Sequence, residues 1–167
     1  MAIFPPLRKK LISAAGAGAV ALTVAFLGGH DGIEGRRYEA YQDIAGVWTV
    51  CDGHTGADII QGKKYSDREC DTLLRQDLLP VRRAVESLVT APLSDYQRAA
   101  LYSFVFNVGE TAFAQSTLLH KLNAGDRKGA CEELRRWVYA GGAKWRGLQN
   151  RREMERVLCL AQSSHDL

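Results

Sequence analysis

The pattern of hydrophobic and polar positions sets an uncharged N-terminal stretch apart from the rest of the chain. Leu11 to Gly29 are nineteen consecutive residues without charge, and the basic run Arg8-Lys9-Lys10 precedes them. A helix of roughly 20 residues is long enough to cross a bilayer. The stretch therefore predicts a membrane-type helix. Its N-terminus should lie in the cytoplasm and the rest of the chain outside, because positive flanks stay inside.

This stretch is only weakly hydrophobic, since it holds six Ala and four Gly against seven Leu, Ile, Val or Phe. Three interpretations remain open. It could be a signal peptide cleaved near Thr23-Val24-Ala25, a permanent anchor, or an uncleaved segment that exports the chain and later leaves the membrane. Lipid stabilises such a helix less than a Leu-rich one, which favours the third interpretation.

Residues 38–62 predict a small antiparallel sheet. They are rich in Gly, Thr, Val, Ile and Tyr, with turn signals at Asp52-Gly53 and Thr55-Gly56. The run Tyr38-Glu39-Ala40-Tyr41 alternates like a strand with one face in water. Glu39 is therefore expected to point into solvent.

The rest of the chain predicts helices. A capping box at Ser66–Glu69 opens one that should stop near Pro80, and a second box begins at Ser94. The second helix has an apolar face at helical spacing, made by Ala100, Leu101, Phe104, Val105 and Val108. Further helices are expected over residues 113–124, 127–139 and 146–162, with breaks at Gly125 and Gly141-Gly142.

These elements predict an α+β fold, with a small antiparallel β lobe, a larger helical lobe and an N-terminal signal-anchor helix. We expect residues 1–29 to form the membrane segment and residues 30–167 one domain, because about 138 residues is an ordinary domain size. A cleft between the two lobes is the expected substrate site.

Charge is uneven along the chain. Of the 22 Lys and Arg residues, three lie in the basic run before Leu11; the remaining 19 equal the number of Asp and Glu. Residues 135–156 carry seven Lys or Arg against two Glu. Such a basic face would suit an anionic polymer, although an ordinary solvated helix surface explains it about as well. Nucleic acid is not an expected partner, because an exported chain would rarely meet it.

Four cysteines lie in the body and none in the N-terminal stretch. An even count in an exported chain favours disulfides, and four cysteines allow three pairings. We favour Cys51–Cys70 and Cys131–Cys159, because each pair would then hold one half of the body together. No CxxC or His-Cys spacing indicates a metal site, and His30, His120 and His165 have no ligand partners at useful spacing.

Two carboxylates and a hydroxyl are candidates for catalysis. Glu34 follows the apolar stretch, so we expect it at the C-terminal end of a helix continuing from there. Beside apolar neighbours such as Ile33 it should keep its proton, whereas Asp43 among polar groups should be ionised. An acid facing a carboxylate is what glycoside cleavage requires, and Thr49 could hold the water. From spacing alone, a surface Glu and a turn Asp remain the commoner explanation.

From about Phe26 to Leu160 the chain resembles the phage-type lysozymes of glycoside hydrolase family 24. The matching motifs occur in the family's order: Glu34-x8-Asp43-x5-Thr49, Gly53-His54, Phe104 to Thr111, Arg135-Arg136-Trp137 and Gly147-Leu148-x-x-Arg151-Arg152-x-x-Glu155. The weak N-terminal segment is similar to that of the signal-arrest-release endolysins of lambdoid phages, and in particular to the phage 21 type.

The resemblance implies a lysozyme-like fold and an N-acetylmuramidase that needs no cofactor or metal. By resemblance Glu34 is the general acid, while Asp43 and Thr49 hold the attacking water, which gives inversion. His54 and Arg151 match positions that brace the site, and Arg151 is expected to pair with Glu34. Three further positions match the family's substrate cleft: Phe106, Asn107 and Thr117.

The resemblance also implies host cell lysis. The body would first be tethered to the inner membrane and later free in the periplasm as a monomer, with a holin or pinholin as functional partner. Some relatives are controlled by thiol exchange, but no cysteine precedes Cys51 here, so we expect a conformational control. Trp48, Trp137 and Trp145 are expected to be packing aromatics. A lytic transglycosylase and a non-catalytic wall-binding protein remain alternatives.

Overall fold

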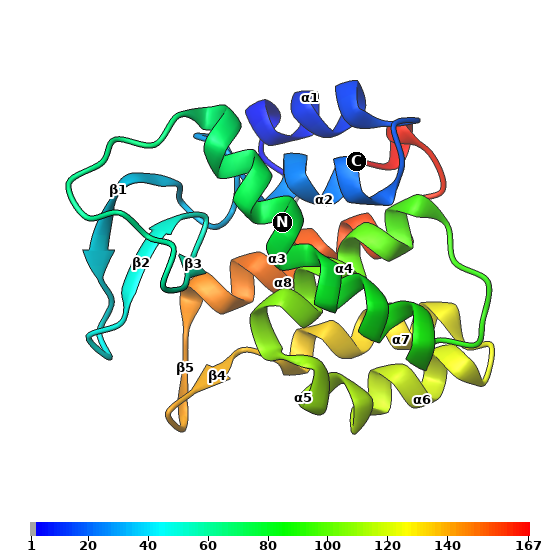
Figure 1. Cartoon of the computed structure of the whole chain (residues 1–167). Helices are drawn as coiled ribbons and strands as arrows, with labels where there is room; N and C mark the ends of the chain where they lie inside the picture. The colour runs from blue at the N-terminus through cyan, green and yellow to red at the C-terminus, as the bar shows by residue number, and fades with distance from the viewer. Residues whose placement is uncertain (1–2) are drawn as a thin grey trace.

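The computed structural model of the chain describes residues 3–167, which form a small sheet beside a larger group of helices (Figure 1). Three antiparallel strands make the sheet in the order β1-β2-β3: β1 Arg37–Gln42, β2 Trp48–Cys51 and β3 His54–Thr55. Tyr41 pairs with Thr49, and Val50 pairs with His54. The predicted sheet is confirmed, but it ends at Thr55 rather than near residue 62. Glu39 is exposed, as expected.

The N-terminal segment is not one helix. It forms α1 Pro5–Ala14 and α2 Ala19–Leu27, separated by a sharp turn. Gly16 and Gly18 both have positive φ there, a conformation that glycine adopts without strain. No helix within residues 3–167 is long and apolar enough to cross a membrane. The expected signal-anchor helix is therefore not seen, because α1 folds back on α2 and α2 packs against α4.

The two capping boxes are confirmed. Ser66 caps α3 Asp67–Leu88, and Ser94 caps α4 Asp95–Val108. The expectation that the first of these helices stops near Pro80 is wrong. Proline removes one backbone donor, but Ala84 and Val85 beyond it are buried in the core, and this packing holds the last turns in helical form.

The remaining helical lobe is more divided than predicted. Ser116 caps a separate helix, so residues 113–124 belong to two helices, and residues 127–139 end in a 3₁₀ turn and a strand. Gly141-Gly142 forms the turn of a two-stranded hairpin. The elements are α5 Glu110–Ala114, α6 Thr117–Asn123, α7 Arg127–Glu133, η1 Leu134–Arg136, β4 Tyr139–Ala140, β5 Ala143–Lys144, α8 Arg146–Leu160 and η2 Ser164–Asp166.

One hydrophobic core joins the N-terminal segment to the helical lobe. Leu7, Leu11, Leu22 and Phe26 are buried in the same cluster as residues of α4 and α8. Both predicted disulfides are present: Cys51–Cys70 ties β2 to α3, and Cys131–Cys159 ties α7 to α8. Because the N-terminal segment contributes core side chains, the body is completed by residues that the sequence assigned to a membrane.

Candidate active site

Glu34 lies in the loop between α2 and β1, which corrects the expectation that it ends a helix. The helix stops at Leu27, and the chain then turns back over its end. The Ile33 amide donates to Phe26 O at 3.0 Å, and the Glu34 amide donates to Leu27 O at 3.1 Å. The end of α2 therefore sets the backbone position of Glu34.

The predicted contact between Glu34 and Arg151 is present. Arg151, on α8, donates from Nη1 to Glu34 Oε1. Its other nitrogens hold Glu155 Oε1 at 3.1 Å and Ser103 O at 2.9 Å. Burial by itself would lower the pKa of Arg151, but the charges of Glu155 and Glu34 outweigh it and raise that pKa above the ordinary value. Arg151 therefore stays cationic and joins Glu34 to α4 and α8.

Glu155 connects Arg151 to a second buried arginine. Its carboxylate is fully buried and accepts from Arg151, from Arg152 and, at 2.7 Å, from the Ser103 hydroxyl. Arg152 also donates to Trp137 O at 3.0 Å and to the side chain of Asn107. The resemblance implies that Asn107 contacts glycan. Its side chain is held in position by the hydrogen bond from Arg152.

Asp43 and Thr49 lie on the sheet lobe. Asp43 is in the β1–β2 turn, and its Oδ1 accepts the amides of Ala45 at 2.8 Å and Val47 at 2.9 Å. Thr49 is buried, and its hydroxyl donates to Val47 O at 3.0 Å. Both side chains are therefore fixed by the turn.

A cavity of about 340 Å³ lies beside Glu34. Gly53 and Thr55 of the sheet lobe, Asp77 of α3, and Phe106 and Asn107 of α4 complete its lining. It is therefore the predicted cleft between the lobes. Asp43 and Thr49 do not line it, and neither does Thr117, which is exposed at the start of α6. Phe106 both lines the cavity and packs against the core.

His54 lies between two carboxylates. Nδ1 is 2.9 Å from Asp77 Oδ2, and Nε2 is 3.0 Å from Asp58 Oδ1. Burial by itself would lower the pKa of His54, but the hydrogen bonds to Asp58 and Asp77 outweigh it and raise that pKa. Burial raises the pKa of Asp77, which opposes this pairing. We favour the imidazolium, because both ring nitrogens face a carboxylate. His54 thus joins β3 to the α3 residue that lines the cavity.

Most cations of the basic stretch pair with carboxylates of the protein itself, which favours the solvated-surface interpretation over an anionic-polymer face. Arg151 and Arg152 are buried. Three others pair with Glu132, Glu133 or Glu153, namely Arg135, Arg136 and Arg156. Among the residues described, Lys144 and Arg146 make no ion pair.

The three tryptophans do not all pack. Trp137 meets the ring of Phe104 edge-on at 5.2 Å, as expected for a packing aromatic. Trp145 is 57% exposed and Trp48 37% exposed, so that expectation is wrong for these two. Trp48 begins the central strand β2, and Trp145 lies between strand β5 and helix α8.

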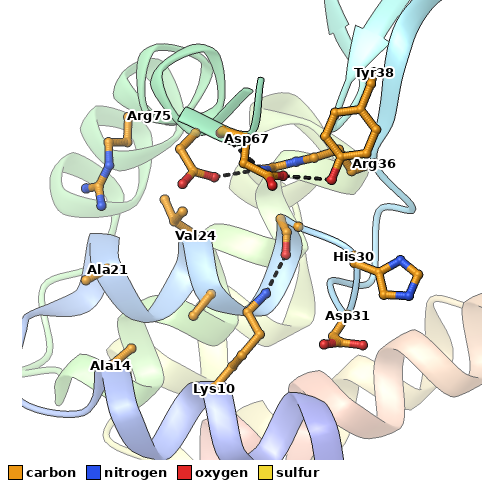
Figure 2. Close-up of a pocket in the computed structure, with 14 residues that line it drawn as sticks. Lys10, Ala14, Ala21, Val24, His30, Asp31, Arg36, Tyr38, Asp67 and Arg75 are labelled. Carbon is orange, nitrogen blue, oxygen red and sulfur yellow. Dashed lines mark hydrogen bonds and ion pairs between the residues drawn. The ribbon is translucent and has the colours of Figure 1, made fainter. Parts of the chain in front are cut away.

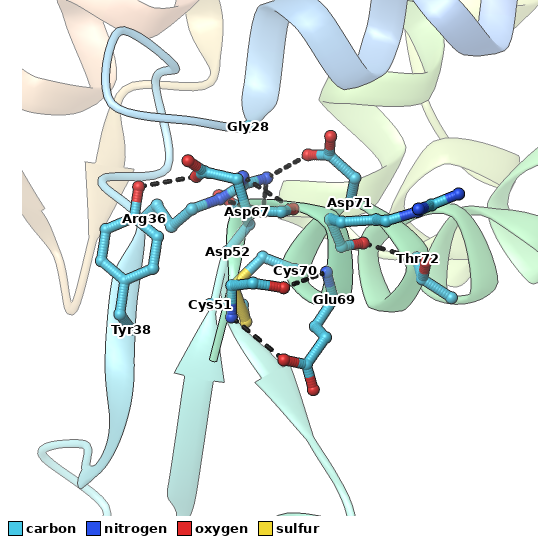
Figure 3. A network of polar contacts seen from close by, with 12 residues as sticks. Gly28, Arg36, Tyr38, Cys51, Asp52, Asp67, Glu69, Cys70, Asp71 and Thr72 are labelled. Atoms are coloured by element: carbon cyan, nitrogen blue, oxygen red, sulfur yellow. Dashed lines mark hydrogen bonds and ion pairs between the residues drawn. A yellow bond between two sulfur atoms is a disulfide. The ribbon is translucent and has the colours of Figure 1, made fainter. Parts of the chain in front are cut away.

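Sequence reasoning missed the arginine that anchors the far end of the Glu34 loop. Arg36 is almost fully buried and holds Asp52 Oδ2 at 2.7 Å, Asp71 Oδ1 at 2.6 Å and Asp67 Oδ1 at 3.0 Å, as Figure 3 shows. Burial opposes its charge, but the hydrogen bonds to Asp52 and Asp71 dominate and raise the pKa of Arg36. Asp67 and Asp71 are four apart on α3, a spacing that places two carboxylates on one helix face. This spacing is the sequence signal from which an acidic cluster facing Arg36 could have been predicted.

Within residues 3–167, no cluster of His, Cys, Asp and Glu is arranged to hold a metal ion.

A second, larger cavity of about 500 Å³ lies between α1, α2 and α3, away from Glu34 (Figure 2). Size does not decide between the two cavities. The smaller one is lined by Glu34, Asp77 and Asn107 and lies between the two lobes.

Known proteins match this chain over nearly its whole length. Residues 31–155 match the family model described as phage lysozyme. The SAR-endolysin of Bacteriophage PS119 is 50% identical over 163 residues, which cover 96% of this chain and 98% of that protein. The SAR-endolysin of Enterobacteria phage P21 is 50% identical over 159 residues, covering 93% and 96%.

A solved structure of a P22 lysozyme mutant superimposes with a TM-score of 0.74 at 32% identity. The match covers 96% of this chain and 99% of that one, so the helical majority and small sheet are a lysozyme-like fold. Since the family model spans well over half of the chain, and close relatives share about half of its residues, the chain belongs to the phage lysozyme family.

Proposed function

We propose that this glycoside hydrolase is a muramidase endolysin that cleaves the β-1,4 bond between N-acetylmuramic acid and N-acetylglucosamine in peptidoglycan. The observation that carries the proposal is the position of Glu34, which lines the cleft cavity and is held there by Arg151. A carboxyl group fixed in a cleft between two lobes is where a glycosidic oxygen can be protonated.

In this proposal Glu34 is the general acid, and Arg151 orients it. Asp43 uses Oδ1 for two backbone amides, so Oδ2 is available to take a proton from water. Thr49 donates its hydroxyl hydrogen to Val47 O, which leaves its oxygen lone pairs to accept from the same water. Water attacking from the face opposite the acid inverts the anomeric carbon, which requires carboxyl groups roughly 6.5–9.5 Å apart. His54 holds the cleft wall through Asp77.

Two other functions, one catalytic and one not, are less well supported. A lytic transglycosylase needs an acid and no positioned water, whereas this chain holds both Asp43 and Thr49 by backbone contacts. A non-catalytic wall-binding protein would not need a glutamate oriented by a buried arginine. Product analysis separates the three: reducing ends, anhydro ends or no cleavage.

The second half of the proposal concerns the N-terminal segment. We infer that residues 1–29 export the chain without cleavage and hold it in the inner membrane until a holin or pinholin depolarises it. The freed monomer then acts in the periplasm. The names of the relatives support this reading. So does the folded segment, because Ile33 and Glu34 are bonded to carbonyls at the end of α2. Glu34 can reach Arg151 of α8 only where α2 packs on the body.

The test compares four preparations on purified murein: wild type and Glu34→Gln, each extracted from membranes and each released. We expect clearing by released wild type, with new reducing ends of inverted configuration, and a loss of at least a thousandfold in the variant. Equal activity of extracted and released wild type would keep the muramidase and reject the membrane control. No clearing by either form would favour the wall-binding alternative.

A further inference from the structure

Lys10 makes a contact that its place in the sequence does not predict. It is the last cation before the uncharged stretch, a position that sequence analysis assigns to membrane orientation. In the folded molecule it lies on α1 and is partly buried. Its Nζ donates to Gly28 O at 2.7 Å, and Figure 2 draws this bond as the dashed line that starts at Lys10.

Gly28 is the residue at which α2 ends and the Glu34 loop begins. The last turn of α2 carries no basic residue of its own. A helix end exposes free carbonyls and partial negative charge, which a cation stabilises. Lys10 supplies that cation from α1. Asp31, the next acidic residue along the loop, adds an attractive charge to Lys10.

The loop beyond Gly28 approaches the end of α2 closely at Gly32. A Cβ on Gly32 would lie 2.2 Å from Gly28 O and 2.3 Å from Leu27 O, so this backbone is pressed against the end of α2. A Cβ on Gly28 would lie 2.9 Å from Arg36 Nη2. Gly28 is therefore held between Lys10 on one side and the Arg36 network on the other. A shift of Gly28 would move the carbonyls that hold Ile33 and Glu34.

The same contact cannot exist while the segment crosses a membrane. Lys10 and Gly28 are 18 residues apart in the chain. In one continuous helix this separation is about 27 Å, at a rise of about 1.5 Å per residue. The two groups would then lie on opposite sides of the bilayer. The bond forms because the turn at Gly16 and Gly18 folds α1 back along α2.

We propose that Lys10 is a positioning residue, whose ammonium clamps the end of α2 and so holds the Glu34 loop in place once the segment has been released. This inference rests on the proposed function, because it takes Glu34 as the acid and the segment as releasable. Lys10 would thus act twice, as an orienting charge in the membrane and as a clamp afterwards. Burial lowers the pKa of Lys10, and the negative charge of Asp31 opposes this shift.

Lys9 provides the matched control. It is the neighbouring cation of the same flank, it is exposed, and within residues 3–167 no polar contact is found for it. Lys10→Met and Lys9→Met remove the same charge from the flank, but only the first removes the clamp. Lys10→Arg keeps a donor at the position. Protease protection of the membrane-inserted forms checks that all three variants are exported like wild type.

The first readout needs no activity. Hydrogen exchange of the Ile33 and Glu34 amides is measured in the released full-length proteins. We expect exchange about tenfold faster in Lys10→Met than in Lys9→Met, with Lys10→Arg close to wild type. Equal exchange in the two Met variants would overturn the clamp.

The second readout is the rate of murein cleavage. We expect kcat of Lys10→Met to fall about tenfold with KM unchanged, and an unfolding temperature close to that of Lys9→Met. Unchanged kcat beside faster exchange would show that the loop is clamped without consequence for catalysis and would overturn the positioning role. Failure of released wild type to cleave murein would instead reject the proposed function, while the exchange experiment still decides the clamp.

Discussion

Two arginines hold the Glu34 loop, and each joins several acceptors at once. Arg151 links Glu34 to Glu155 and to the backbone of Ser103, while Arg36 links three aspartates. A planar guanidinium with five donors can do this, whereas a lysine ammonium cannot match the geometry. The orientation of one glutamate therefore depends on residues from α3, α4, α8 and the sheet.

His54 gives the site a predictable response to pH. Its folded-state pKa is raised by Asp58 and Asp77, so the imidazolium stabilises the fold fully below the unfolded pKa, which is about 6.5. This stabilisation is lost as pH rises through the folded-state pKa. We expect wild type to unfold at a higher temperature than His54→Asn at pH 5.5, with a difference of a few degrees that shrinks by pH 8.5. Thermal melts of both proteins across that range measure it.

The variant Asp77→Asn tests whether Asp77 is the main cause of the raised pKa of His54. Asp58 is largely exposed and its charge is screened by solvent, so Asp77 should provide most of the effect. The variant should show a weaker dependence on pH than wild type. A difference between wild type and His54→Asn that grows with pH would contradict the assignment of an imidazolium.

At the scale of elements, the connection from α2 to β1 decides where the acid lies. It turns back on the helix that precedes it, with the Lys10 contact at its beginning and the Arg36 network at its end. Gly32 is its most crowded position, because backbone oxygens occupy the space of a side chain. The composition of the helix and the loop does not indicate this crowding, because it arises only when the loop turns back onto the end of α2.

Gly32→Ala should therefore displace Glu34. The new methyl group would meet two backbone carbonyls that cannot rotate away. A shift of about 1 Å in a catalytic group can cost about a hundredfold in rate, and we expect a loss of that order in murein clearing. Gly147→Ala is the control, since nothing lies near its Cβ position and alanine favours helix α8. Equal activity of the two variants would show that the loop tolerates the methyl group.

At the scale of the whole molecule, the N-terminal segment is part of the core. Leu22 is 1% exposed, whereas Ile12 in the same segment is 38% exposed. Replacing either residue by Ala reduces the hydrophobicity of a membrane helix by a similar amount. In the folded protein the two changes should differ, because only Leu22→Ala leaves a cavity.

We expect Leu22→Ala to lower the free energy of unfolding of the released protein by about 2–5 kcal/mol, and Ile12→Ala by less than about 1 kcal/mol. Denaturant unfolding of both variants measures this. Similar small losses would mean that the segment does not pack on the body in solution, and the coupling of release to activity would lose its structural basis.

Local signals in the sequence determined much of this protein. Two capping boxes, the turn at Asp52-Gly53 and the pattern of the sheet depend on neighbouring residues, so they could be predicted. The disulfide pairs followed from the separation of the chain into two halves. The family motifs indicated Glu34, Asp43 and Thr49 as site residues, and Arg151 as the partner of Glu34.

Long-range packing decided the rest. Composition predicted one membrane-type helix from Leu11 to Gly29, but hydrophobicity does not distinguish lipid from a protein core. The body offers α2 an apolar surface, so the segment breaks at Gly16 and Gly18 and joins the core. Pro80 remains inside a helix for the same reason. The contacts of Lys10 and Arg36 link positions far apart in the chain, which no local pattern specifies.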